Sequence, residues 1–401
     1  MFENYFLKWK ERYAIYLRIK KIQIIKTDYS LISPAIKSFC IRFSVPIILL
    51  SWVLLFLIHL NFYGVVTDLE SKKYIAEAQN LISNKGLSAP RFWYYSITII
   101  IIAVSLKIKI GFIGAVFIQS FLNLLAILFF HKSLKLIFKQ SSLNPLIIIC
   151  ILTTFSPYSS WNVFLFTESI FYSSILVLIS TIFNHNYNKK TSNALAVIFA
   201  LTITILSRPL GVLFIPAVLF YFYTNLSQRL KFIILPVAII GAGVLFYITN
   251  IVFTTTTDAT ITLSAKQGCV VCGIIPAKEP QLILLKDGSP MQQLSYYISH
   301  NFFHFLLLAL QRGKAFFFII RPYYSTTHNF FILMFIIPLY TLSIISFVKQ
   351  KEKKYRPVFY FMFISVATFA IAVILQCDDY HNRFILGLFP FFLIFSAKAI
   401  T

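Results

Sequence analysis

Four short segments of the chain bring carboxylate and guanidinium side chains directly beside long apolar runs. Their sequences are VVTDLESKKYIAEAQNLISNKG at 65–86, FTESIFY at 166–172, LSRPLG at 206–211 and QCDDYHNRFILGLFP at 376–390. Carboxylates transfer protons and arginines bind anions, so these side chains could do chemistry. Ionisable groups at the edge of a bilayer are costly and therefore tend to mark function. The four segments are the candidates for a functional site.

Each candidate also has a purely structural alternative. Glu168 and Arg208 could form an ion pair between neighbouring helices, and Arg383 could anchor a helix at the membrane interface. Asp68 could cap the helix predicted for LESKKYIAEAQNLI, because aspartate is favoured at a helix N-terminus, where it places negative charge at the positive end. Capping and catalysis are compatible, so Asp68 stays a candidate for both.

The composition indicates which elements must position these residues. Of the 401 residues, 58% are hydrophobic and only 12% are charged, which is about half the charged fraction of an ordinary soluble domain. Many apolar runs approach the roughly 20 residues that cross a bilayer. These features exclude a water-soluble globule and predict a polytopic membrane protein. The formal charge of +23 would suggest nucleic-acid binding in a soluble protein, but here it is typical of cytoplasmic loops.

The predicted fold is an all-α transmembrane bundle of about ten spans with both termini on the inner side. The predicted spans are 41–63, 111–131, 143–160, 161–183, 192–207, 209–225, 231–252, 328–348, 357–376 and 384–400. This threading puts every strong basic cluster on the inner side, as the positive-inside rule requires. The clusters are Lys132/Lys135/Lys139, Lys189/Lys190, Arg229/Lys231 and the run KQKEKKYR at 349–356.

The chain is expected to divide into a short leader and a membrane domain. Residues 1–40 are basic and lack a signal-peptide cleavage site, so they are predicted to form a cytoplasmic segment that could lie on the anionic inner leaflet. Residues 41–401 are predicted to form the transmembrane domain.

Two apolar stretches, 93–110 and 302–321, are predicted to lie along the outer membrane face as interfacial helices. Counting the first alone as a span would invert every later loop, and the second carries two charges near its middle, which hydrocarbon disfavours. The alternative that one of them spans stays open. With this choice the outer loops are long, at about 64–110 and 253–327.

Several motifs on the predicted outer face occur in a familiar order. The first outer loop has the form D-x5-Y-x3-A, followed by a glycine and by P-x2-W-Y, and TES-x-F-Y, SRP-x-G and R-F-x5-P come later in the chain. This order resembles that of the C-type membrane glycosyltransferases (GT-C), which include protein O-mannosyltransferases and the aminoarabinose transferase of lipid A. The residues of the first two motifs are Asp68, Tyr74, Ala78 and Gly86, then Pro90, Trp93 and Tyr94.

The resemblance implies transfer of a sugar from a polyprenyl-phosphate carrier to a glycan, lipid or protein acceptor on the outer face. It also favours the inner membrane of a bacterium, with the site on the periplasmic side. By this resemblance Asp68 is the general base that deprotonates the acceptor hydroxyl. The leaving phosphate would be held by arginines, for which the candidates are Arg208, Arg321 and Arg383. The candidate substrate-binding residues are Tyr74, Glu168, Asp378, Asp379 and His381.

The sequence departs from the family in its first loop. Many relatives have adjacent acidic residues there, whereas Leu69 separates Asp68 from Glu70. On a helix these two carboxylates would not share a face, so Glu70 is not expected to assist Asp68. The chain also has no appended soluble domain of the kind that several relatives use for acceptor recognition. Two other functions stay open, namely a flippase or transporter of lipid-linked glycans and a polysaccharide polymerase.

The cysteines and the possible metal ligands complete the candidates. In the sequence GCVVCG, Cys269 and Cys272 have the C-x2-C spacing, and in an outer loop a disulfide between them is expected. A zinc site would need a second pair of ligands, which the sequence lacks. A divalent cation such as Mg²⁺ or Mn²⁺ could bridge Asp68 or Asp378 to the donor phosphate, and the sequence leaves this cofactor open.

Overall fold

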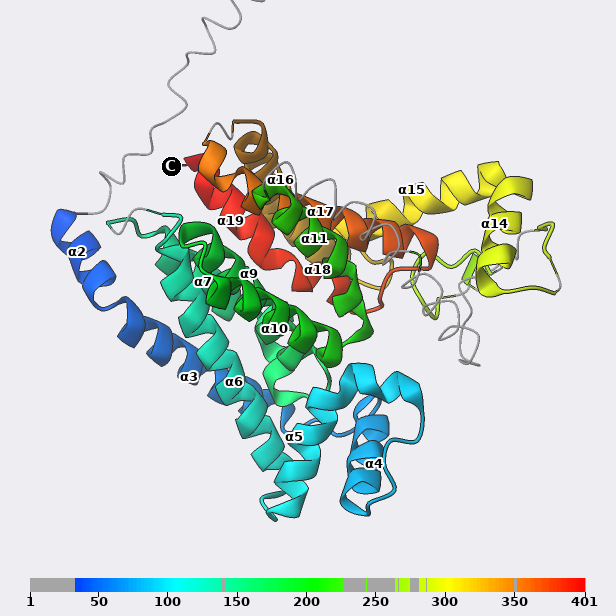
Figure 1. The fold of residues 1–401 in the computed structure, drawn as a ribbon, viewed down its shortest axis with the longest axis horizontal. Coiled ribbons are helices and arrows are strands. Elements are labelled where there is room, and N and C mark those ends of the chain that lie inside the picture. Colours follow the sequence, from blue (N-terminus) through cyan, green and yellow to red (C-terminus); the bar gives the residue numbers. More distant parts are fainter. Residues whose placement is uncertain are drawn as a thin grey trace, which may run out of the picture.

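The computed structural model describes residues 33–138, 141–226, 243, 264–265, 267–274, 281–285, 287–349 and 352–400. Within these ranges the chain is helical and forms no strand beyond two isolated bridges. Figure 1 shows the helices as a bundle, with α4 and α5 at one end and α14 and α15 to one side. The all-α prediction is thus confirmed for the described part. The predicted span 231–252, apart from residue 243, and residues 1–32 of the basic segment lie outside the described residues.

The helices have the following bounds in the described part of the chain. The α-helices are α2 (Pro34–Arg42), α3 (Ser44–Tyr63), α4 (Ser71–Ile82), α5 (Ser96–Lys107), α6 (Gly111–Leu134), α7 (Asn144–Thr154), α8 (Ser156–Ser159), α9 (Glu168–Tyr187), α10 (Thr191–Ser207), α11 (Ile215–Asn225), α14 (Pro290–His300), α15 (Phe302–Phe318), α16 (Thr326–Lys349), α17 (Arg356–Leu375), α18 (Arg383–Gly387) and α19 (Phe389–Ile400). The 3₁₀ helices are η2 (Pro90–Tyr95), η3 (Ser160–Val163), η4 (Pro209–Phe214) and η5 (Lys353–Tyr355).

Four of these segments are long and apolar enough to cross a bilayer, namely α3, α6, α16 and η5 together with α17. A fifth candidate is the pair formed by α7 and the 156–163 segment, which is bent by 73°. The chain is therefore a helical integral membrane protein with four or five clear candidate spans among its described residues. Helices α10, α11 and α19 are apolar but shorter, so the total of about ten spans stays a prediction.

The outward faces of the candidate spans are apolar, which is the reason to place them in lipid. On α3 a stripe at Ile48, Trp52 and Phe56 follows the helical period and is buried. The opposite face exposes large apolar side chains, such as Phe62 with 77% of its surface accessible. On α16, Val348 is also 77% exposed. Contiguous apolar surface of this kind needs lipid rather than water around it.

Helix α9 is the centre of the bundle and packs against α6 and α10. It is buried over almost its whole length although it contains several serines. These hydroxyls bond to carbonyl groups one turn earlier in the same helix, as Ser173 Oγ does to Ser169 O at 2.6 Å. Buried small polar residues let neighbouring helices approach closely. The helix has 20 residues and is therefore about 30 Å long, so its ends lie near opposite sides of the bundle.

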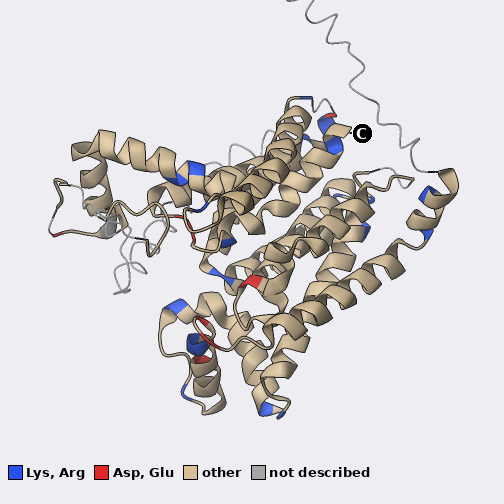
Figure 2. Cartoon of the chain, turned by 180° about the vertical axis from the view of Figure 1, so that it is seen from behind, with Lys and Arg blue, Asp and Glu red and all other residues tan. Residues whose placement is uncertain are grey.

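Basic residues gather at the C-terminal end of α9. The Nζ atom of Lys354 lies 5.0 Å from the centre of the Tyr187 ring, and the Tyr355 hydroxyl donates to Leu136 O at the end of α6. The predicted inner clusters at 132–135, 189–190 and 353–356 therefore lie at this end of the molecule. Figure 2 shows that charged residues are sparse along the helices and occur mainly at their ends and connections. Of the predicted inner residues, Lys139, Arg229, Lys231, Gln350 and Lys351 lie outside the described part.

Two backbone bridges tie the connecting segments together at the other end of α9. Val66, just after α3, pairs with Phe164, just before α9. Val271 pairs with Asp378 in the same way, beside the disulfide between Cys272 and Cys377. Each bridge holds two segments of the chain side by side. The first constrains the positions of Glu70 and Glu168, and the second constrains those of Asp379 and Arg383.

A proline-induced break positions the LSRPLG motif. Helix α10 ends at Ser207, and Arg208 is extended with φ −165° and ψ 145°, as expected for a residue that precedes a proline. Pro209 then begins η4. Gly211 lets η4 lie close against α10, because a Cβ atom there would be 2.3 Å from the carbonyl oxygen of Thr204. The chain therefore changes direction at Arg208, between the two helices.

The two stretches predicted to be interfacial are short helices. The first contains η2 and α5, and α5 packs against α4 and α6 with Ile99 and Ile102 fully buried. At 12 residues, α5 is too short to cross a bilayer alone. The second contains α15, whose Arg312 is buried and donates to the carbonyl oxygens of Cys269 and Ile374. Their orientation relative to a membrane stays a prediction.

Candidate functional site

Five charged residues from four distant parts of the chain meet at the N-terminal end of α9. We call Glu70, Glu168, Arg208, Asp379 and Arg383 the ion cluster. Glu70 directly precedes α4, Glu168 begins α9, Arg208 separates α10 from η4, and the other two flank the start of α18. The most distant pair, Glu70 and Arg383, is 313 positions apart. The predicted convergence of Glu168, Arg208, Asp379 and Arg383 is therefore present in the fold.

Arg383 is the centre of the ion cluster. Its Nε and Nη2 atoms donate to the two carboxylate oxygens of Asp379 at 2.8 and 2.7 Å. Its Nη1 atom donates to Glu168 Oε1 at 2.9 Å. Glu70 lies across the end of the guanidinium, with Oε1 3.1 Å from Nη2 and Oε2 3.1 Å from Nη1. With three carboxylates around it, Arg383 is a buried organising residue and not the interfacial anchor considered above.

Arg208 pairs with the same oxygen of Glu168 that Arg383 binds. The ion pair between neighbouring helices is thus confirmed as a contact. The Glu168 carboxylate is completely buried, yet its second oxygen, Oε2, has no hydrogen-bond partner among the described residues. A buried carboxylate oxygen without a donor is costly. Glu168 is therefore held by two arginines on one oxygen and keeps a free acceptor on the other.

The acidity of Asp379 reflects its partners. Burial raises the pKa of this carboxyl, but the hydrogen bonds and positive charge of Arg383 outweigh burial and lower the pKa to about 2. The backbone N–H of His381 also donates to Asp379, at 2.9 Å. Burial likewise opposes ionisation of Glu70, but Arg383 and then Lys73 bring its pKa below the ordinary value. Both carboxylates are ionised at neutral pH.

This acidity predicts a pH dependence of stability. Because the pKa of Asp379 is lower in the folded chain than its ordinary value of 3.8, its stabilising contribution is complete above about pH 4 and is lost as the pH falls towards 2. The contribution is about 2 kcal/mol. Thermal unfolding in detergent between pH 5 and pH 2 should show this slope. It should become shallower in Asp379→Asn and persist in Asp287→Asn, which alters an exposed carboxylate; equal slopes would contradict the assignment.

Arg321 and Asp378 form a second, separate ion pair. Both side chains are inaccessible to solvent, and Arg321 Nη2 donates to Asp378 Oδ2 at 2.5 Å. Arg321 also donates to the carbonyl oxygens of Asp379 and Ala315. These contacts fix the 378–383 segment against the end of α15. The role of Arg321 as a phosphate ligand stays a prediction, but its side chain is completely inaccessible, whereas that of Arg383 is 9% exposed.

Asp68 lies outside the ion cluster. Its side chain is 76% exposed and contacts Lys72 Nζ at 3.3 Å. Between Asp68 and Glu70, Leu69 adopts a left-handed conformation with φ +57°, and α4 begins only at Ser71. The helix expected to include Leu69 and Glu70 therefore starts later, and Asp68 is not its cap. The turn directs Glu70 toward Arg383 and leaves Asp68 exposed beside Lys72, so the two carboxylates have different partners, and the expectation that Glu70 does not assist Asp68 stays a prediction.

Tyr74 and His381 are neighbours of the ion cluster. Tyr74 is 1% exposed, and its ring lies 5.3 Å from that of Tyr95. Burial raises the pKa of Tyr74 well above its ordinary value. Burial lowers the pKa of His381, whose ring meets Trp161 edge to face at 6.0 Å. Tyr74 is therefore a buried neighbour of the cluster. Its stacking on a sugar stays a prediction.

The disulfide pairing differs from the expected one. Cys272 is bonded to Cys377, while Cys269 is a buried free thiol. The predicted Cys269–Cys272 bridge is therefore wrong. The two short segments that carry the bonded cysteines are already paired through Val271 and Asp378, which brings the two sulfur atoms together. Because Cys377 directly precedes Asp378, the bridge fastens the segment that leads to Arg383.

An apolar groove of about 320 Å³ adjoins the ion cluster. Its walls come mainly from α16, the connection that precedes it, and Phe155 and Pro157. One end is polar, where His381 and Asn382 line it directly before Arg383. Asn382 has a left-handed backbone, so the chain turns there from the groove to the cluster. The groove can hold an apolar chain whose polar end lies near Arg383.

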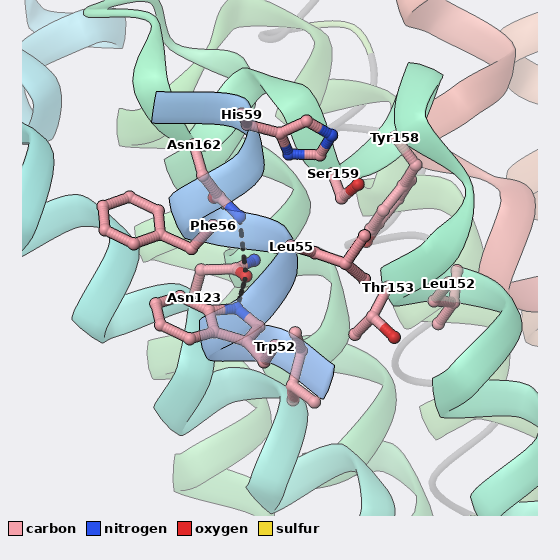
Figure 3. Close-up of a pocket in the computed structure, with 11 residues that line it drawn as sticks. Trp52, Leu55, Phe56, His59, Asn123, Leu152, Thr153, Tyr158, Ser159 and Asn162 are labelled. Atoms are coloured by element: carbon pink, nitrogen blue, oxygen red, sulfur yellow. Dashed lines mark hydrogen bonds between the residues drawn. The ribbon is translucent and has the colours of Figure 1, made fainter. Parts of the chain in front are cut away.

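A second, smaller cavity lies inside the bundle, below the 156–163 segment. Figure 3 shows that Trp52, Asn123 and Asn162 meet there, and the indole N–H of Trp52 and the amide of Asn162 both donate to Asn123 Oδ1, at 3.0 and 3.1 Å. The cavity volume is about 20 Å³, enough for one water molecule. Asn162 also accepts from Ser169 in α9. No sequence motif indicated this network. It connects the 156–163 segment to the first turn of α9, where Glu168 lies.

The described residues contain no group of three or more His, Cys, Asp or Glu side chains arranged to hold a metal ion. The Mg²⁺ or Mn²⁺ considered from the sequence therefore stays a prediction, in which Asp68 or Asp378 would act together with the substrate phosphate.

Comparisons with known proteins give no relative. No family model matches the chain, no curated protein matches it, and no solved structure matches it.

Proposed function

We propose that the protein is a membrane glycosyltransferase that moves a sugar from a polyprenyl-phosphate carrier to a glycan, lipid or protein acceptor. The observation that carries the proposal is the ion cluster itself. Its members come from the first loop, the start of α9, the α10–η4 break and the last loop, the segments expected to converge in a GT-C transferase. A cluster with two arginines and an adjoining apolar groove suits a ligand that has an anionic head and an apolar chain.

The membrane orientation that we propose has the ion cluster on the outer side and both termini in the cytoplasm, with about ten spans. The contacts of Lys354 with Tyr187 and of Tyr355 with Leu136 support this, because they gather basic segments at the opposite end of α9 from Glu168. In this orientation the long loops at 64–110 and 253–327 are outside.

In the proposed reaction, Asp68 takes the proton of the acceptor hydroxyl as its oxygen attacks the anomeric carbon of the sugar. The bond from that carbon to the phosphate oxygen breaks, and the carrier phosphate leaves with the bonding electrons. Arg383, with Arg208 beside it, stabilises the charge that develops on this phosphate. The carboxylates of Glu70, Glu168 and Asp379 are already bound to arginine, whereas that of Asp68 contacts only the exposed Lys72.

The proposal predicts that Asp68→Asn lowers kcat by about 10²–10⁴-fold, the usual contribution of a general base. Purified protein in detergent is incubated with a radiolabelled polyprenyl-phosphate sugar and lipid-linked glycan acceptors, and glycosylated product and released polyprenyl phosphate are counted. Lys72→Met, which removes the exposed partner of Asp68, is the matched control and should stay within about twofold. Equal rates for Asp68→Asn and the unaltered protein would reject this base.

The same assay separates a transferase from the flippase considered from the sequence. Detergent provides no second compartment, so a transporter would bind the donor without consuming it. Release of polyprenyl phosphate that depends on acceptor supports the transferase, and an intact donor after prolonged incubation with active, folded protein rejects it.

A further inference from the structure

Every nitrogen of the Arg383 guanidinium already contacts a carboxylate oxygen. A guanidinium has five N–H groups in a planar fork, and the contacts with Asp379, Glu168 and Glu70 also number five. An anion can therefore bind Arg383 only if it displaces one of these carboxylates. The question is which one.

The three carboxylates are held very differently. Asp379 is 10% exposed and also accepts from the backbone N–H of His381. Glu168 is fully buried and is also bound by Arg208. Glu70 is 34% exposed, and its other partner, Lys73, is 3.8 Å away and itself 44% exposed. Glu70 is the most accessible partner of Arg383, and its other contact is the longest of the three.

We propose that Glu70 occupies an anion-binding site on Arg383 and Lys73, and that a phosphate monoester, such as the carrier phosphate that the proposed transfer releases, displaces it on binding. The site is the end of the Arg383 guanidinium, where Nη1 and Nη2 each face one oxygen of Glu70. Two phosphate oxygens can accept the same pair of N–H groups, because carboxylate and phosphate match this fork equally well. The inference rests on the proposed function only for the identity of the lipid that carries the phosphate.

The charge balance of the site requires such an exchange. Glu70, Glu168 and Asp379 carry three negative charges, and Arg208, Arg383 and Lys73 carry three positive ones. A phosphate dianion added to this neutral set would leave two uncompensated negative charges in a largely buried place, which is costly. If Glu70 moves into water, only one uncompensated negative charge remains. Glu70 can move outward because the left-handed turn at Leu69 faces solvent.

The apolar groove can bind the apolar part of the ligand. Its polar end at His381 and Asn382 directly precedes Arg383 in the chain, so a prenyl chain in the groove can lead to a phosphate at the position of Glu70. The chemical class that fits is therefore an isoprenoid phosphate monoester, with inorganic phosphate as a weaker ligand that uses the same anion site.

The test is binding of farnesyl phosphate to the detergent-purified protein, measured by isothermal titration calorimetry. Glu70→Gln removes the competing charge and is expected to lower Kd by about three- to tenfold, the range of a partly exposed ion pair. Inorganic phosphate should show the same ratio between the two proteins at weaker affinity. Farnesol, which lacks the phosphate, should bind both proteins equally.

Asp287→Asn is the matched control, because it removes one negative charge from an exposed side chain outside the ion cluster. Its Kd for farnesyl phosphate should stay within about twofold of the unaltered protein. Unchanged or weaker binding by Glu70→Gln, or an equal gain in Asp287→Asn, would overturn the proposal. Tighter binding by Glu70→Gln in a preparation that transfers no sugar would uphold the anion site and reject the transferase.

Discussion

Replacement of Arg383 with methionine is expected to lower the free energy of unfolding by about 3–5 kcal/mol and to abolish sugar transfer. The substitution leaves Glu168 and Asp379 buried with one of their cationic partners gone, and removal of one partner from a buried ion pair typically has a cost of this size. It also removes the group that joins the first loop, α9 and the last loop. Denaturant titration in detergent measures the first effect, and the transfer assay measures the second.

The control for this prediction is Arg42→Met. Arg42 is an exposed arginine at the end of α2, where its guanidinium lies near the Phe43 ring, so its replacement should change stability by less than about 1 kcal/mol. If the two variants unfolded alike, the ion cluster would not be a stabilising centre. An Arg383→Met protein that still transferred sugar at the normal rate would remove Arg383 from the proposed mechanism.

The second large effect is expected from Cys377→Ser. The bond between Cys272 and Cys377 joins positions 105 residues apart, and closing a loop of this length constrains the unfolded chain by about 4–5 kcal/mol. Its loss also releases the segment that begins with Asp378, so the Arg321 pair and the Asp379–Arg383 contacts should weaken. The midpoint of thermal unfolding, measured with and without a phosphine reductant, reports the loss.

The cysteine variants distinguish the two possible bridges. Cys269→Ser should keep the reductant-sensitive stability, because Cys269 is a free thiol. Cys272→Ser and Cys377→Ser should both lose it. Peptide mapping of the unreduced protein should recover a linked pair that contains residues 272 and 377. A reductant-insensitive Cys269→Ser protein, or a linked 269–272 peptide, would restore the pairing predicted from the sequence.

Most members of the ion cluster could be predicted from the sequence. Glu168, Arg208 and Arg383 each stand where an apolar run ends, and charges that cannot face hydrocarbon must gather with one another or with water. Given one consistent threading, these ends fall at the same side of the bundle. The extended conformation of Arg208 was predictable in the same local way, because Pro209 follows it.

The choice between Asp68 and Glu70 could not be made from the sequence. The helix pattern of the 65–86 segment suggested a start at Leu69, but the left-handed turn there delays α4 until Ser71. A leucine is not a residue that predicts such a turn. The turn is stabilised by contacts far away in the chain, where Val66 pairs with Phe164 and Arg383 binds Glu70.

The sequence by itself determined that the chain is a helical membrane protein. Long hydrophobic runs with few charges need a bilayer around them, and a helix satisfies the backbone hydrogen-bonding groups of each run within the run itself. It also indicated that charged residues are rare within the candidate spans and gather at their ends. Only the tertiary structure decided which carboxylates share Arg383 and that Cys377, not Cys269, is bonded to Cys272. Those partners are distant in the chain, and the free energy of a single buried contact depends on packing that no local pattern encodes.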